Sequence, residues 1–327
     1  TLEEGSRRAI EHYEINLKKR PDHMGTRWLL NLAYMTLGEH PDGVPEQWRL
    51  PADIFDGDGA IERFEDVAAS IGVATVGLAG GSAVEDFDGD GLMDIVVSSW
   101  GLFDPLRYFR NAGDGTFSER TEQAGLSGQI GGLNIEQADY DNDGDVDLLV
   151  LRGAWMGEEG RIPNSLLRNG GDGTFVDVTR QSGLFMRHPS NSAAFADYDN
   201  DGWLDLFVGN ESGRQPHACQ LFRNRGDGTF TDVASSLGLD HVGFVKGVTW
   251  GDVDNDGLID LYVSQFYQDN VLYRNMGEVE GAWRFTPSTS MPGPDQSFPT
   301  WFWDYDNDGW LDLFVGGYNM DELGDMA

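Results

Sequence analysis

The chain has 327 residues, a formal net charge of −34 and a single cysteine, Cys219. The acidic surface argues against nucleic acid and anionic membranes as partners and favours solubility and cation binding. One cysteine excludes an intrachain disulfide and a cysteine-based zinc site, and no apolar run reaches the roughly 18 residues that a membrane span needs.

Two helices are expected at the start of the chain, over residues 2–19 and 24–37, because apolar side chains recur there at helical spacing. Gly38 stands where a C-terminal cap belongs. The apolar face expected on the second helix consists of Trp28, Leu29, Leu32, Ala33 and either Met35 or Thr36. The pair is similar to one tetratricopeptide-type hairpin, which cannot build a solenoid alone. We therefore expect residues 1–45 to form a helical cap, with a separate peptide-binding groove as the alternative.

The rest of the chain, residues 46–327, is an array. A nine-residue aspartate pattern starts at Asp86 (DFDGDGLMD), Asp139 (DYDNDGDVD), Asp197 (DYDNDGWLD), Asp252 (DVDNDGLID) and Asp304 (DYDNDGWLD). The start-to-start steps are 53, 58, 55 and 52 residues. A period of this length with strand-like content is typical of a β-propeller blade.

Each copy of the pattern predicts a calcium loop. Aspartates at positions 1, 3, 5 and 9 can converge because glycine at position 6 permits a sharp turn. Four carboxylates, the position-7 carbonyl and a water approach the six to eight oxygens that Ca²⁺ takes. We expect about five Ca²⁺ ions with these ligands: Asp86, Asp88, Asp90, Asp94, Asp139, Asp141, Asp143, Asp147, Asp197, Asp199, Asp201, Asp205, Asp252, Asp254, Asp256, Asp260, Asp304, Asp306, Asp308 and Asp312.

The residues after each loop distinguish it from an EF-hand. An EF-hand needs a bidentate glutamate at position 12 and flanking helices. Here position 12 is always valine: Val97, Val150, Val208, Val263 and Val315. The surrounding residues form short β-branched and aromatic runs that indicate a buried strand, so each loop is expected to join two strands.

A second recurring sequence, Gly-Asp-Gly-Thr-Phe, begins at residues 113, 171 and 226. It predicts a tight hairpin turn between the third and fourth strands of a blade. A divergent copy follows Arg274, and an earlier Gly-Asp-Gly lies within residues 54–67. Asp58 of that earlier copy is therefore expected to be a turn residue and not a calcium ligand.

The pattern of half-blades at the two ends of the array does not decide how the ring closes. Residues 54–67 have the pattern of outer strands, and residues 302–318 have the pattern of inner strands with no partner after them. The fold class is expected to be all-β, a propeller of four-stranded blades with calcium loops and five blades visible. Either the two halves meet in a closed five-bladed ring, or further blades lie between them in a larger ring.

Long connections at residues 99–107, 152–165, 209–220 and 286–298 are where a propeller usually carries recognition. Four residues there are the first to test, although packing is expected for each: Trp100, Arg152, Trp155 and Arg161. Three histidines on neighbouring blades, His188, His217 and His241, could bind copper or act as a base, but scattered surface positions are favoured. No catalytic residue or organic cofactor is predicted.

The loops with their trailing strands resemble the FG-GAP or VCBS repeats of integrin-α-type propellers. The helical start, Arg63-Phe-Glu-Asp-Val-Ala, Pro163-Asn-Ser-Leu-Leu-Arg-Asn and Phe298-Pro-Thr-Trp-Phe-Trp-Asp resemble the ASPIC/UnbV family. The resemblance implies the propeller fold and calcium. Members of that family generally continue into further blades and a C-terminal segment that this sequence does not contain, so the resemblance implies part of a seven-bladed ring as the alternative to a closed five-bladed one.

The leading functional hypothesis is a calcium-stabilised binding, adhesion or protein-interaction scaffold with a protein or glycan ligand. Millimolar calcium outside cells would fill such loops, which favours an extracellular or periplasmic location, and the first residue, Thr1, suits both a cleaved signal peptide and a fragment. One alternative is a propeller enzyme or metal-dependent accessory factor acting on polysaccharide or a secondary metabolite. Another is a structural subunit of an extracellular assembly, which self-associates through its open blade.

Overall fold

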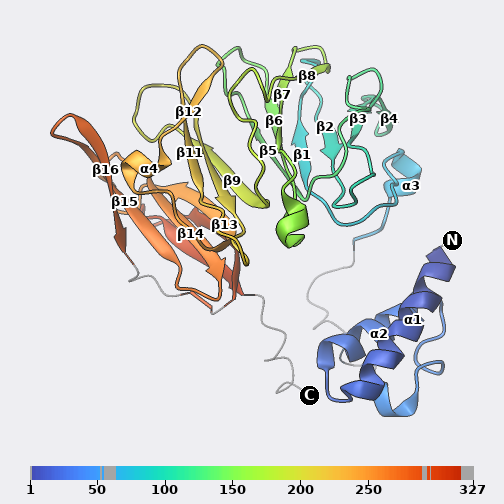
Figure 1. The fold of residues 1–327 in the computed structure, drawn as a ribbon. Coiled ribbons are helices and arrows are strands. Elements are labelled where there is room, and N and C mark those ends of the chain that lie inside the picture. Colours follow the sequence, from blue (N-terminus) through green and yellow to red (C-terminus); the bar gives the residue numbers. More distant parts are fainter. Residues whose placement is uncertain (1, 52–53, 55–63, 289–292, 295, 318–327) are drawn as a thin grey trace. The chain divides into compact units, whose positions relative to one another are not determined.

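The structure is a computed structural model that describes residues 2–51, 54, 64–288, 293–294 and 296–317 (Figure 1). The chain divides into two compact units, one formed by Thr1–Asp66 with Asn319–Ala327 and the other by Val67–Tyr318. None of the described helices combines the length and the apolar character that crossing a membrane requires.

Two helices make up most of the described part of the first unit. They are α1 (Leu2–Lys19) and α2 (Met24–Thr36), followed by a single 3₁₀ turn, η1 (Glu46–Trp48). Helix α2 ends at the cap residue Leu37, and Gly38 follows with φ +69°, a conformation that favours glycine. The two helices therefore lie where the sequence predicts them.

The predicted buried face of α2 was wrong for three of its residues, whereas Ala33 is buried as predicted. Trp28, Leu29 and Leu32 are 36–43% exposed, whereas Leu30 and Asn31 are fully buried. Asn31 occupies the buried face because its side chain forms hydrogen bonds with backbone groups. The Asn31 amide donates to the backbone oxygens of Arg27 and Trp48, and its Oδ1 accepts from the backbone nitrogen of Leu50. This asparagine holds the segment after the hairpin against α2, and hydrophobic periodicity cannot detect such a role.

The second unit is built from antiparallel sheets whose strands neighbour one another in chain order. We call each sheet with its loops a repeat unit. The first is β1 (Ser82–Glu85), β2 (Asp94–Val97), β3 (Arg107–Asn111) and β4 (Phe117–Glu119); the second is β5 (Asn134–Ala138), β6 (Asp147–Leu151), β7 (Ser165–Asn169) and β8 (Phe175–Asp177); the third is β9 (Ser190–Ala196), β10 (Asp205–Asn210), β11 (Gln220–Asn224) and β12 (Phe230–Asp232); the fourth is β13 (Phe244–Gly251), β14 (Asp260–Phe266), β15 (Val271–Val279) and β16 (Ala282–Ser288). The described residues also form short helical turns: α3 (Ala68–Ile71) precedes β1, η3 (Gly157–Gly160) lies between β6 and β7, and α4 (Ala234–Leu237) follows β12.

The fifth repeat unit contains two described strands, β17 (Ser297–Trp303) and β18 (Asp312–Gly317). The inner half expected over residues 302–318 is thus a two-stranded sheet, preceded by strand β16 where a long connection was expected at residues 286–288. Of the outer half expected over residues 54–67, residues 55–63, including Asp58 and Ile61, lie outside the described residues. Residues 64–67 form no strand, and Phe64 is 95% exposed.

The sheets pack face to face with their sequence neighbours, and an apolar core fills each of the three interfaces among the first four repeat units. Strand β6 is buried at every position because sheets cover both of its faces. At the first interface, Phe87 meets the rings of Tyr108 and Phe175 edge-on, with centroids 6.1 and 5.6 Å away. These observations confirm an all-β fold of four-stranded antiparallel sheets with a few helices.

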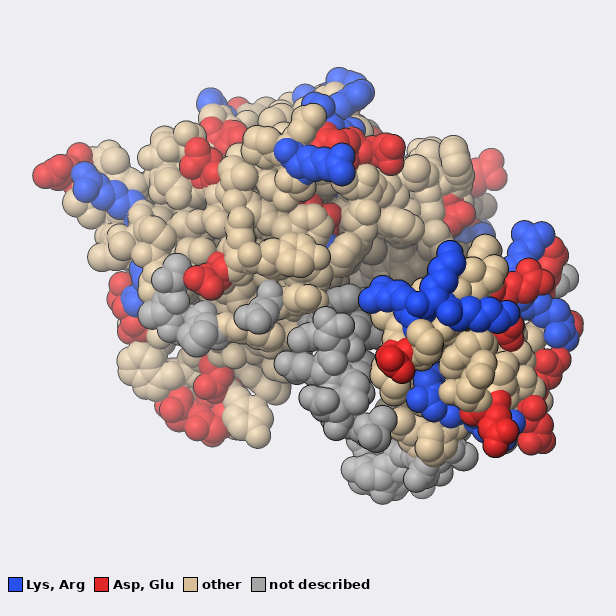
Figure 2. Space-filling model, turned by 60° about the horizontal axis from the view of Figure 1, so that its bottom comes forward, with Lys and Arg blue, Asp and Glu red and all other residues tan. Residues whose placement is uncertain are grey.

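The antiparallel order gives each repeat unit two ends. The aspartate loops and the hairpin turns lie at one end, which we call the loop face. The connections between second and third strands lie at the other end, which we call the connection face. Large areas of uncharged surface separate scattered groups of acidic and basic side chains in the view of Figure 2.

Candidate metal centres

The five aspartate loops have the same backbone hydrogen bonds. In the second loop, Asp139 accepts from the backbone nitrogens of Asp143 and Gly144, at 3.1 and 3.0 Å, and Asp143 accepts from that of Asp145 at 3.0 Å. The equivalent three bonds recur in the other four loops. The backbone of each loop therefore wraps around the carboxylate at position 1.

Left-handed residues make the tight winding possible. Glycine at position 6 has φ between +86° and +94° in all five loops. Position 4 is also left-handed: it is glycine in the first loop and asparagine, which tolerates this conformation, in the other four. The sequence predicted the first of these two positions and missed the second.

Three carboxylates converge in every loop. In each set one oxygen per residue lies within 4.8 Å of the others, the separation expected of ligands around one cation. The sets are Asp86, Asp88 and Asp90; Asp139, Asp141 and Asp147; Asp197, Asp199 and Asp205; Asp252, Asp254 and Asp260; and Asp304, Asp306 and Asp308. The remaining predicted ligands lie in the same loops outside these sets: Asp94, Asp143, Asp201, Asp256 and Asp312.

In the first four loops the position-9 aspartate is buried, whereas Asp312 of the fifth loop is exposed. In the second loop Asp147 is 1% exposed and accepts from the backbone nitrogens of Asn169 and Tyr140, at 2.8 and 3.3 Å. Burial raises the pKa of Asp147 to about 8, and neighbouring loop carboxylates add to the shift. Asp205 has the same environment and a pKa of about 8. Ionising these groups beside other carboxylates is unfavourable unless a cation compensates.

Buried oxygens at position 3 support the same conclusion. The Oδ1 atoms of Asp88, Asp141 and Asp199 are shielded from solvent and have no hydrogen-bond partner. A buried carboxylate oxygen without a donor is rare in a folded protein, because its desolvation is then uncompensated. The donor set consists of oxygens only, which suits a hard divalent cation. The residues present therefore fit a metal ion.

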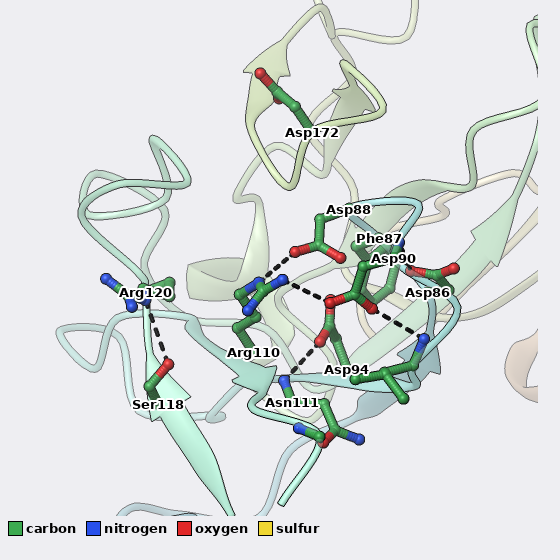
Figure 3. A network of polar contacts seen from close by, with 12 residues as sticks. Asp86, Phe87, Asp88, Asp90, Asp94, Arg110, Asn111, Ser118, Arg120 and Asp172 are labelled. Atoms are coloured by element: carbon green, nitrogen blue, oxygen red, sulfur yellow. Dashed lines mark hydrogen bonds and ion pairs between the residues drawn. The ribbon is translucent and has the colours of Figure 1, made fainter.

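In three of the repeat units, an arginine on the third strand forms ion pairs with the aspartates of the loop. Figure 3 shows the Arg110 guanidinium between Asp88 and Asp90, with an ion pair to each. Arg223 pairs with Asp199 at 2.7 Å in the third loop, and Arg274 pairs with Asp260 at 3.1 Å in the fourth. The Arg-Asn dipeptide visible in the sequence was the available signal, but its contact with the aspartates was not predicted.

The hairpin turns are separate from the carboxylate sets, as the sequence predicts. Asp172 accepts from the backbone nitrogen and the hydroxyl of Thr174, at 3.1 and 2.6 Å. In Figure 3 it lies on its own hairpin, and that hairpin contacts the first aspartate loop through a bond from the Gly173 backbone nitrogen to the Phe87 oxygen at 3.0 Å. Asp114 and Asp227 make the same two bonds. Each turn joins the third and fourth strands.

The asparagine after the arginine connects neighbouring repeat units, a role that the sequence analysis missed. Its amide donates to the position-2 carbonyl of the preceding loop, from Asn169 to Phe87 at 3.1 Å, from Asn224 to Tyr140 at 2.8 Å and from Asn275 to Tyr198 at 2.9 Å. Its backbone nitrogen holds the position-9 aspartate of its own unit. The same asparagine thus bonds to the loop of its own repeat unit and to the loop of the preceding unit.

Comparison with known families identifies these units. The model of the FG-GAP-like repeat matches residues 86–150, 154–208, 197–263 and 252–315. The chain belongs to the FG-GAP-like repeat family. Three of the matched segments begin at the first aspartate of a loop, and all four end at the position-12 valine of the following loop. Each matched segment therefore ends with an aspartate loop and the buried strand that follows it.

Relatives of these FG-GAP repeats carry the name cartilage acidic protein 1, which bears out the resemblance to the ASPIC/UnbV family. The human protein is 29% identical over 72% of this chain, the mouse protein 29% over 72% and the Xenopus tropicalis protein 30% over 72%. This chain spans 35%, 36% and 38% of their respective lengths. A solved structure, the V. cholerae biofilm matrix protein Bap1, matches with a TM-score of 0.36 and 18% identity, over 66% of this chain and 30% of that one.

The connection face of the FG-GAP repeats has a pocket of about 400 Å³. Its lining includes Trp100, Phe103, Ile130, Arg152, Met156 and Pro163. Arg152 is 6% exposed, and its guanidinium donates to the backbone oxygens of Ile130 and Pro163 and to the Gln129 and Ser165 side chains. Burial lowers its pKa to about 10. Arg152 therefore builds the wall of the pocket, as the packing interpretation predicts.

Trp155 is 43% exposed and packs over a buried ion pair at a place where several repeat units meet. The Lys246 ammonium lies 3.0 Å from the centroid of the Trp155 ring and forms an ion pair with Glu211, and both charged side chains are at most 1% exposed. Phe244 and Phe266 also face this ammonium. Burial lowers the pKa of Lys246 to about 8 and raises that of Glu211. The sequence offered no signal for this pair.

The three predicted histidines do not form one cluster. His188 and His217 approach with their Nδ1 atoms 3.1 Å apart. His241 instead contacts the Gln265 side chain at 2.9 Å and the Tyr273 hydroxyl at 3.0 Å. Arg161 is exposed and lies near enough to His188 to help lower its pKa, although burial is the larger cause.

Proposed function

We propose that this FG-GAP repeat chain is a calcium-stabilised β-propeller that acts outside the cytoplasm as a binding or adhesion scaffold. The observation that carries the proposal is the recurrence of one loop geometry five times, each with three carboxylates whose oxygens lie within 4.8 Å of one another. All twenty predicted aspartates belong to these loops, and we propose them as ligands for about five Ca²⁺ ions, either directly or through water.

The chemistry of the loops supports calcium over a transition metal. No loop set includes a histidine or cysteine, and oxygen-only sites suit Ca²⁺ and Mg²⁺. Carboxylates at irregular loop positions tolerate the variable coordination of Ca²⁺ better than the strict octahedron of Mg²⁺. Loops of this kind fill at extracellular calcium concentrations, which supports an extracellular or periplasmic location.

The face-to-face packing of successive four-stranded sheets supports the propeller. We propose that residues 46–327 belong to this domain and that residues 1–45 form a helical cap. The pocket of about 400 Å³ at the connection face is the proposed site for a protein or glycan ligand, because Trp100 and Phe103 supply aromatic surface beside it.

Thermal unfolding in calcium and in EDTA tests the calcium proposal. If each site has a dissociation constant of about 10 μM, then about 1 mM Ca²⁺ contributes on the order of 2.7 kcal/mol per site. We expect EDTA to lower Tm by many degrees and Mg²⁺ at equal ionic strength to restore little of it. The same Tm in EDTA and in calcium would contradict calcium stabilisation.

A further inference from the structure

The pocket of about 400 Å³ at the connection face lies where connections of the first two repeat units meet, and bulky apolar side chains surround it. Among its lining residues, Phe103 is 88% exposed, Ile130 44% and Leu102 43%. Exposed apolar side chains around a concavity mark an interaction site, because a partner that covers them removes them from water.

The polar side chains of the lining are already bonded within the wall. They belong to Trp100, Gln129, Arg152, Ser165 and Asp177. The Trp100 indole donates to the backbone oxygen of Ala154 at 2.9 Å. The Gln129 side chain accepts from Arg152 at 3.0 Å and donates to Asp177 at 2.9 Å. The Ser165 hydroxyl accepts from Arg152 at 2.8 Å. These groups build the wall and leave few hydrogen-bonding positions for a ligand.

Backbone groups of the lining are engaged as well. The oxygens of Ile130 and Pro163 accept from Arg152, at 2.8 and 3.2 Å. The backbone nitrogen of Gly131 donates to the Asp104 oxygen at 2.9 Å. A bound sugar needs partners for its hydroxyls, because each hydroxyl that loses water without gaining a partner weakens binding. An apolar side chain has no such requirement, so the pocket favours an apolar side chain over a sugar.

The charges around the pocket favour a basic partner. Glu158 and Glu159 are exposed in η3, and one exposed cation of the same connection, Arg161, opposes them. The buried charge of Arg152 is balanced by Asp177, which acts to raise the pKa of the arginine against the larger, lowering effect of burial. The whole chain has a formal net charge of −34. Basic residues of a partner are therefore attracted to this surface, and acidic ones are repelled.

We propose that this pocket binds a protein segment in which one bulky apolar side chain is flanked by lysines or arginines. The apolar side chain fills the space beside Trp100 and Ile130, Phe103 packs against it, and the basic residues lie along the acidic rim. This inference rests on the proposed function as a binding scaffold, and it decides between the two ligand classes named there, protein and glycan.

Short peptides test the proposal on the full chain with excess calcium. The acetylated and amidated peptide KKWKK should bind with 1:1 stoichiometry in calorimetry. The peptide KKAKK should bind at least about ten-fold more weakly, because it lacks the apolar side chain. The peptide EEWEE should also bind about ten-fold more weakly, because its charges are repelled. No binding of KKWKK, or equal binding of KKWKK and KKAKK, would overturn the proposal.

Two protein variants locate the site. Phe103→Ala should weaken the binding of KKWKK about ten-fold, since it removes aromatic surface at the pocket. The side chain is 88% exposed, so the variant should keep its Tm. Tyr267→Ala is the matched control, because Tyr267 is an aromatic residue of the fourth repeat unit that is 76% exposed and does not line this pocket. It should leave binding unchanged, and equal effects of both substitutions would overturn the site.

Neutral oligosaccharides separate this inference from the proposed scaffold function. Cellohexaose and chitohexaose should not displace KKWKK from the full chain. If either sugar displaces the peptide and loses its own binding in Phe103→Ala, the pocket is a glycan site. That result would overturn the inference and leave the scaffold function standing, whereas calcium stabilisation is tested independently by Tm.

Discussion

The side-chain amide of Asn224 donates a hydrogen bond to the backbone oxygen of Tyr140, 84 residues away, at 2.8 Å. Both residues are only 2% exposed, so the bond crosses the interface between the second and third repeat units away from water. Equivalent bonds cross the two neighbouring interfaces. The sheets are therefore held together by a buried polar contact as well as by apolar packing.

Replacing Asn224 with alanine should destabilise the chain by about 2 kcal/mol, because the Tyr140 and Leu204 carbonyls lose a buried donor. Denaturant unfolding measures this loss. Asp227→Ala, in the exposed hairpin turn of the same repeat unit, is the control and should cost less. Equal losses would contradict the importance of the bridge.

Replacing a loop aspartate should remove calcium where replacing a hairpin aspartate does not. Asp141→Asn changes a carboxylate of the second set, whereas Asp172→Asn changes a residue bonded to Thr174 in a turn. We expect the first variant to bind about one ion fewer by native mass spectrometry. If both variants lose an ion, the division into metal loops and turns is wrong.

Glu136 should make stability depend on pH. Burial raises its pKa to about 7 from a usual value of 4.5, so the folded state retains a proton that the unfolded chain releases. This side chain therefore lowers stability progressively as pH rises from about 4.5 to 7. Glu136→Gln should stabilise the chain by up to about 3 kcal/mol at pH 8 and by much less at pH 5. A pH-independent change in Tm would contradict this assignment.

The Lys246–Glu211 pair should show strong coupling. Lys246→Met leaves Glu211 buried without its counter-charge, which should cost about 3–5 kcal/mol. The double variant Lys246→Met, Glu211→Gln should recover much of this loss, because no uncompensated charge remains. A double-mutant cycle of unfolding free energies measures the coupling, and additive losses would show that the pair is not coupled.

The repeated parts of the fold were predictable from the sequence because their signals are local. Glycine at position 6, the apolar run from Leu148 and the Gly-Asp-Gly turns each specify a conformation within a few residues. The aspartate sets follow from the same spacing. The five loops could thus be located as candidate metal centres before their geometry was known.

The contacts between repeat units could not be predicted in this way. The partner of Asn224 lies 84 residues away, and Lys246 pairs with a glutamate 35 residues away. Each side chain satisfies a backbone or charge requirement that exists only once two sheets pack. Asn31 in the first unit misled the periodicity argument for the same reason, since a polar residue there occupies the buried face.

The left-handed asparagines at loop position 4 connect successive aspartate loops by hydrogen bonds. Asn142 donates to the Gly202 carbonyl of the next loop at 3.0 Å, Asn200 to Gly257 at 3.3 Å and Asn255 to Gly309 at 3.1 Å. The backbone nitrogen of each accepting glycine also donates to the first aspartate of its own loop. The asparagine bond therefore connects the backbones of two successive loops. The first loop has Gly89 at this position and cannot donate. Side-chain links of this kind thus join the second to the fifth loop, whereas the first loop is tied to the second repeat unit through the Phe87 carbonyl, which accepts from Asn169 and from the Gly173 backbone nitrogen.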